Sequence, residues 1–170
     1  MMSLPSCAAA VFAVLLPLST SQKLAEFATR ADLDLPELAR MRAADAIVDC
    51  IGCILAGLAE PVATVVSSVV HDSDRGVPLI GTGRNASPMD SALFHGTLAH
   101  AIDYDDTNHP AYAHPSAVLV PAMLAIGETR RSSGADFITA YIVGFQVFGK
   151  LGRVLNFAHY QRGWHSTARS

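Results

Sequence analysis

The feature that most constrains the fold is a long apolar segment at residues 34–61. Its apolar side chains recur every three or four residues, which is the period of an α-helix. Pro36 suits the first turn of a helix and Pro61 lies just beyond the end of the pattern. The second half is apolar on nearly all sides, which predicts a helix buried centrally among others. Gly52 and Gly57 would let a neighbouring helix approach closely.

With the helix at residues 34–61 included, helices are predicted along most of the chain. They cover residues 21–31, 34–61, 87–103, 116–131 and 133–155. Ser21 and Ser87 are the predicted N-caps of the first and third. Residues 62–70 are rich in β-branched side chains, yet their length and context suit a short helix, and residues 77–80 suggest an extended segment. Because strand patterns are otherwise almost absent, the predicted fold class is all-α.

The composition is that of one domain with a hydrophobic core. Apolar residues make up 51% of the 170 residues and charged residues 16%, so enough apolar surface is available for burial. The formal net charge of −3 and the scattered Lys and Arg residues provide no basic patch for nucleic acid or an anionic membrane. We therefore expect no nucleic-acid partner, no membrane and a cytoplasmic location.

Residues 1–20 are interpreted as an apolar N-terminal extension, and the helical domain is predicted over residues 21–170. The run at residues 7–18 has the length of the hydrophobic part of a signal peptide. It is too short to span a bilayer and contains Pro17. Residues 1–6 carry no Lys or Arg, which a secretory signal would have. The segment is therefore signal-like without the full signal pattern.

The three cysteines predict neither a disulfide framework nor a redox site. Cys7, Cys50 and Cys53 are an odd number without a pairing pattern. Cys50 and Cys53 have CxxC spacing, but they lie in an apolar helical run without a second pair of ligands. We expect them to be buried core residues.

Titratable residues are concentrated at residues 100–118, in the sequence HAIDYDDTNHPAYAHPSAV. Three interpretations are open for these three histidines and three aspartates. They could be solvated or capping residues, with His114 or Ser116 at the start of the next helix. They could bind a metal ion, although their spacing matches no established ligand motif. They could also perform acid–base chemistry.

The acid–base interpretation rests on how histidine and carboxylate side chains cooperate. Histidine exchanges protons near neutral pH, and a neighbouring carboxylate fixes its tautomer. Asp103, Thr107 and His114 could converge if the loop folds back over a helix end, with the hydroxyl orienting a substrate oxygen. His165, which follows Trp164 in RGWHST, suits a partly dry pocket.

Four segments in this order resemble the MmgE/PrpD family. They are DCIGCILAG, HAIDYDDTN with HPSAVLVPAMLAIGE, GADFITAYIVGFQVFGKLGR, and HYQRGWHST, and the resemblance covers residues 22–167. It implies part of a large all-helical domain, with the family's smaller α+β lid domain absent from this chain. It also implies homodimers in the full-length family. The implied activity is a cofactor-independent lyase acting on a small tricarboxylate, as in 2-methylcitrate dehydratase and cis-aconitate decarboxylase.

The resemblance assigns site residues by matching motif to motif. His114 and His165 match histidines that line the active site, and they are the expected catalytic acid and base. Asp103 and Thr107 match the substrate-binding aspartate and threonine of the family's DxDDT segment. Neither a cofactor nor a metal ion is implied.

The sequence also departs from the family. The family's active-site lysines lie further along the chain than Ser170, and Lys23 and Lys150 do not match them. A chain of this extent is therefore expected to be a truncated domain with little or no lyase activity. The alternatives are a non-catalytic helical module that pairs with a full-length family member, an isomerase or epimerase of the same family, and a metal-dependent hydrolase.

Overall fold

The computed structural model describes residues 19–29, 34–155, 158–163 and 167. The chain divides into two compact units, Met1–Leu33 and Asp34–Ser170. Within the first unit, α2 (Thr20–Thr29) begins with a capping box. The Ser19 hydroxyl accepts from the Gln22 N–H at 3.2 Å, and the Gln22 side-chain oxygen accepts from the Ser19 N–H at 2.8 Å. The sequence had predicted Ser21 as the N-cap. The N-cap is instead Ser19.

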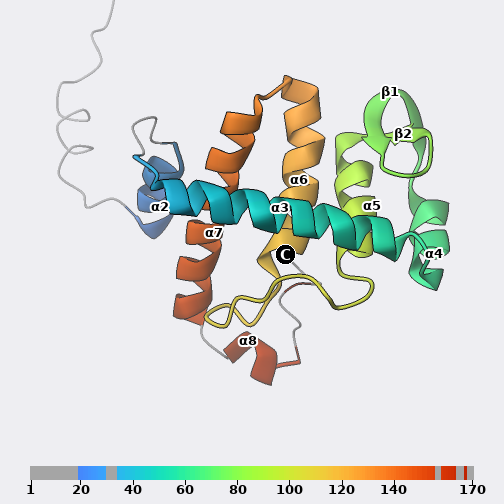
Figure 1. Cartoon of the computed structure of the whole chain (residues 1–170). Helices are drawn as coiled ribbons and strands as arrows, with labels where there is room; N and C mark the ends of the chain where they lie inside the picture. Colours follow the sequence, from blue (N-terminus) through green and yellow to red (C-terminus); the bar gives the residue numbers. More distant parts are fainter. Residues whose placement is uncertain (1–18, 30–33, 156–157, 164–166, 168–170) are drawn as a thin grey trace, which may run out of the picture. The chain divides into compact units, whose positions relative to one another are not determined.

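The second unit is mostly helical, which confirms the predicted fold class. Its elements are α3 (Glu37–Gly57), α4 (Pro61–Val69), β1 (Asp72–Leu79), β2 (Arg84–Ala86), α5 (Pro88–Ala99), α6 (Pro115–Arg130), α7 (Gly134–Leu155) and α8 (Ala158–Gln161). Helix α3 runs across α5, α6 and α7 and contacts all three (Figure 1). Ser87 caps α5 as predicted, because its hydroxyl accepts from the Asp90 N–H at 3.1 Å.

Helix α3 is buried along one face only. Ile47, Cys50 and Ile54 face the core, whereas Val48 is 69% and Leu55 50% exposed. The predicted burial on all sides is therefore wrong among the described residues, where α5, α6 and α7 cover a single face. Gly57 does permit a close approach, because a Cβ there would overlap the backbone of Leu98. Gly52 faces open space and has no such role.

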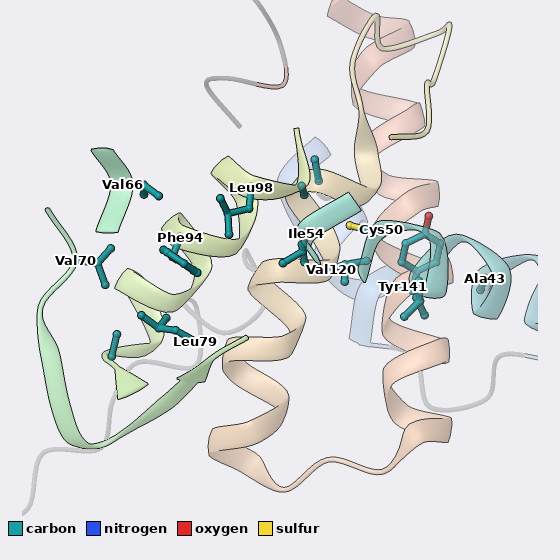
Figure 2. Packing of buried hydrophobic residues seen from close by; sticks show 14 residues of the cluster. Ala43, Cys50, Ile54, Val66, Val70, Leu79, Phe94, Leu98, Val120 and Tyr141 are labelled. Carbon is teal, nitrogen blue, oxygen red and sulfur yellow. The ribbon is translucent and has the colours of Figure 1, made fainter. Parts of the chain in front are cut away.

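The core gathers buried side chains of α3, α4, α5, α6, α7 and the β-hairpin (Figure 2). Ile54, Phe94, Leu98 and Val120 are each at most 1% exposed. Cys50 and Cys53 are buried free thiols, as predicted. Burial raises the pKa of the Cys50 thiol well above its ordinary value. The thiol therefore stays protonated, which is typical of an inert structural cysteine.

No single helix among the described residues is both long and apolar enough to cross a bilayer, and only α3 and α4 taken together, bent by 92°, meet that length and composition.

The β-hairpin was not foreseen beyond the extended segment at residues 77–80. Strands β1 and β2 pair antiparallel, with an irregularity between Asp72 and Val77. The polar start of β1 has no alternating apolar pattern that would predict a strand. Its position therefore depends on hydrogen bonds from other parts of the chain. The Arg84 guanidinium supplies them, because it donates to Asp72 Oδ1 at 2.6 Å, Ser67 Oγ at 2.6 Å and the Val70 carbonyl at 3.0 Å.

His95 on α5 is a buried structural histidine that joins this helix to the hairpin. Its Nε2 accepts from the Ile80 N–H at 3.0 Å, so its proton lies on Nδ1, 3.3 Å from Ser91 Oγ. Burial lowers the pKa of His95 below its ordinary value. The unfolded chain therefore takes up a proton at higher pH than the folded chain does.

We expect the free energy of unfolding to lose a His95 contribution as the pH falls below the ordinary histidine pKa. The contribution is complete above that pKa, and its slope is at most about 1.4 kcal/mol per pH unit. Urea unfolding between about pH 7.5 and about pH 5.5 measures the slope. His95→Gln should flatten it, whereas His71→Gln, at an exposed position, should not. Equal slopes in the wild type and His95→Gln would contradict the expectation.

Candidate active site

The titratable loop joins the C-terminal end of α5 to the N-terminal end of α6, and it is drawn in yellow in Figure 1. The predicted end of this helix was Asp103, but α5 ends at Ala99. His100 is its C-cap residue, and the chain turns there, with the Asp103 N–H donating to the His100 carbonyl at 3.3 Å. This early turn places the His100 side chain against the loop that follows it.

A buried carboxylate lies between two histidines of this loop. The side chain of Asp105 is fully buried. Its Oδ1 is 2.9 Å from His100 Nδ1 and 3.3 Å from His114 Nδ1. The two imidazole rings are 4.4 Å apart between centroids. Asp105 is therefore placed to orient both rings and to stabilise a positive charge on either of them.

A second carboxylate approaches His114 from the solvent side. Asp103 Oδ1 is 3.6 Å from His114 Nε2, and its side chain is 77% exposed. Asp103 has a φ of 51°, in the left-handed region that aspartate tolerates better than most residues. The His114 ring, which is 16% exposed, thus has a carboxylate near each nitrogen.

Two of the four predicted site residues are brought together. Asp103 and His114 converge as expected, whereas Thr107 is exposed on the same loop and is not part of the cluster. His165 lies outside the described residues, so its predicted catalytic role remains a prediction.

Asp106 fixes the loop to the start of α6. Its Oδ1 accepts from the Ser116 N–H at 2.9 Å, and its Oδ2 accepts from the Ser116 hydroxyl at 2.8 Å. The Tyr141 hydroxyl lies 2.6 Å from Ser116 Oγ and donates to it, since the serine proton is already engaged. Burial raises the pKa of Tyr141 to about 12. The side chain that caps α6 is thus Asp106, not His114 or Ser116.

An open groove of about 660 Å³ adjoins the cluster. Small and apolar side chains of α4, α5 and α6 line most of it, and His100 and Thr167 contribute polar atoms. Thr167 Oγ1 also accepts from the His114 N–H at 2.9 Å. The groove is therefore lined by one histidine of the cluster, His100, and the other, His114, is linked to it through the lining residue Thr167.

Sequence reasoning missed His100 and Asp105 as members of the cluster. Both lie in the quoted titratable stretch, but a separation of five residues is not a spacing that a helix or a strand brings together. Three aspartates lie within four residues there. The sequence does not indicate which of the three aspartates has the buried side chain.

Comparisons with known proteins agree on one family. The family model described as the MmgE/PrpD N-terminal domain matches residues 22–170. The cis-aconitate decarboxylase-like protein oryM of Aspergillus oryzae is 32% identical over 143 residues, covering 78% of this chain and 30% of that relative. Human cis-aconitate decarboxylase is 39% identical over 75 residues, covering 42% and 15%. The Aspergillus terreus cis-aconitate decarboxylase is 27% identical over 143 residues, covering 79% and 29%. The chain thus spans less than a third of the length of these relatives.

Proposed function

The chain belongs to the MmgE/PrpD family, and on this premise we propose that its titratable loop forms one wall of a lyase active site for a small tricarboxylate. The favoured reaction is decarboxylation of cis-aconitate, the activity in the names of the relatives. The observation that carries the proposal is the placement of the His114 ring between the carboxylates of Asp103 and Asp105, in a cluster whose other histidine, His100, lines a groove.

The reaction needs a group that delivers a proton to carbon. The bond to one carboxylate breaks, carbon dioxide leaves, and the electron pair stays on the carbon skeleton, where the adjacent alkene delocalises it. In the proposal, protonated His114 donates to this carbanion-like centre and regains a proton from solvent. The two aspartates hold the ring in place and pair with its positive charge. General acid catalysis of this kind contributes about 10²–10⁴-fold to rate.

Substrate binding needs positive charge in addition to this wall. A tricarboxylate is an anion, and the cluster is itself rich in carboxylates, so cations must hold the substrate and stabilise developing charge. Among the described residues that line the groove there is no Lys or Arg. We therefore propose that the cationic wall comes from outside the described residues. His165 as a second proton-transfer group and Thr107 as a substrate contact complete the proposal.

A substrate panel tests the reaction type. The protein is incubated separately with cis-aconitate and with 2-methylcitrate, and carbon dioxide release and alkene absorbance are followed together. We expect carbon dioxide from cis-aconitate at a low rate, because in this proposal the cationic wall of the site lies outside the described residues. Alkene formation from 2-methylcitrate without carbon dioxide would replace decarboxylation by dehydration, and no turnover of either compound would overturn the lyase proposal.

A second candidate function, as a helical module that pairs with another family chain, is favoured by the exposed face of α3. Its exposed large apolar side chains are Leu38, Met41, Val48 and Leu55. An uncovered apolar face of this kind is typical of an interaction surface. The module predicts a stable complex with a full-length family member by size-exclusion chromatography, in the absence of turnover.

A further inference from the structure

We propose that His100, Asp103, Asp105 and His114 bind a divalent transition-metal ion of the zinc type. Each of these residues offers one ligand atom, and the four atoms all lie within 4.8 Å of one another. Two imidazole nitrogens and two carboxylate oxygens are a donor set that zinc uses in proteins. The sequence spacing showed no such site, because the four residues meet only after α5 has ended and the loop has turned back.

The separations within the cluster fit a small tetrahedral ion. With bonds of about 2.0–2.2 Å, neighbouring ligand atoms of a tetrahedral zinc site lie about 3.3–3.6 Å apart. Two recorded separations can be compared with this range, because Asp105 Oδ1 lies 2.9 Å from His100 Nδ1 and 3.3 Å from His114 Nδ1. Asp103 Oδ1 faces the other ring nitrogen of His114, Nε2, at 3.6 Å. The shortest of them needs to open by only a few tenths of an ångström.

An independent observation at Asp105 points to a cation. Its side chain is fully buried, and its Oδ2 has no hydrogen-bond partner among the described residues. A buried carboxylate oxygen without a donor is costly, and a positive ion is one of the few groups that offset the cost. The neighbouring Asp106 has both its oxygens satisfied by Ser116, so the shortfall is specific to Asp105.

The charge around the cluster also favours a dication. Asp103 and Asp105 contribute two negative charges when the histidines are neutral, which a divalent ion balances. His100 caps the C-terminal end of α5, where the helix dipole attracts positive charge. The two imidazoles select a transition-metal ion over Mg²⁺ or Ca²⁺, which prefer oxygen ligands alone.

The metal site goes beyond the proposed function, and the two compete for one residue. A His114 ring that binds metal through one nitrogen can carry a proton only on the other, so it is not the doubly protonated acid of the proposed function. On the proposed function, zinc is therefore an inhibitor of proton transfer, and the acid–base reaction belongs to the metal-free protein.

Cobalt and zinc binding test the proposal without any activity assay. The protein is freed of metal with a chelator and titrated with Co²⁺, whose tetrahedral complexes absorb visible light, and Zn²⁺ is then added as competitor. We expect a visible band that zinc abolishes. Asp105→Asn and His100→Ala should weaken zinc binding, measured by calorimetry, by at least about 10–100-fold. His109→Gln, at an exposed position of the same loop, should leave it unchanged.

A measurement on the wild type keeps the proposal testable if a variant fails to fold. Co²⁺ is paramagnetic, so it should broaden the ring NMR signals of His100 and His114 and spare those of His71. Absence of the band, broadening centred on His71, or zinc affinity equal in folded Asp105→Asn and the wild type would each overturn the metal site. A protein that decarboxylates cis-aconitate but binds no zinc loses the metal site alone. One that binds zinc without turnover loses the lyase alone.

Discussion

Replacement of His114 by glutamine is expected to lower turnover of cis-aconitate by about 10²–10⁴-fold. Glutamine keeps much of the size and hydrogen-bonding capacity of histidine, but it cannot donate a proton to a carbanion. The fold should survive, because the His114 side chain makes no capping hydrogen bond to α6 and the glutamine amide can still donate to the buried Asp105 carboxylate. The turnover number from carbon dioxide release, with circular dichroism on the same samples, measures the effect.

The control for this variant is His109→Gln. His109 lies on the same loop, is exposed and is not part of the cluster, so its replacement should leave turnover near the wild-type value. Both variants are assayed in the presence of a chelator, so that a lost metal ligand cannot account for a difference. A loss at His114 of less than about 10-fold would remove it from the proton-transfer step.

Asp106→Ala is expected to lower the free energy of unfolding by about 2–4 kcal/mol. Loss of an N-cap costs about 1 kcal/mol, and loss of a hydrogen bond to a charged group costs about 1.5–3 kcal/mol. The variant loses both, and it leaves the Ser116 N–H and hydroxyl without their acceptor beside the buried Tyr141. Urea unfolding, with midpoint and slope fitted together, measures the change.

The control is the neighbouring residue. Thr107→Ala, at an exposed position, should change the free energy of unfolding by no more than about 0.5 kcal/mol. Asp106→Asn keeps an acceptor for the capping bond but loses the charge, so its effect should be intermediate. Equal losses at Asp106 and Thr107 would show that the capping network does not stabilise the loop.

The helical part of the fold was predictable because its signals are local. Apolar side chains that recur every three or four residues predicted the helices. Ser87 followed by Pro88 predicted the start of α5. The hairpin was missed because β1 depends on contacts that are not local in the sequence, such as that of Asp72 with Arg84. The burial of α3 was overestimated because hydropathy shows which side chains are apolar, whereas its neighbours decide which face they cover.

The site was predictable to the extent that a motif carries it. Asp103 and His114 followed from a family motif, and the structure brings them together. The roles of Asp105 and Asp106 could not be separated by sequence, because adjacent acidic residues differ only in where their side chains are buried. Asp105 faces two histidines, and Asp106 faces Ser116.

Titration of the chain with cis-aconitate, followed by the ring NMR signals of its histidines, is the most direct test of the proposed active-site wall. The ring signals of His100 and His114 should shift together and reach saturation, while those of His71 and His109 stay in place. Shifts of equal size at all four residues, or saturable shifts confined to His71, would show that the loop is not a binding wall for a tricarboxylate.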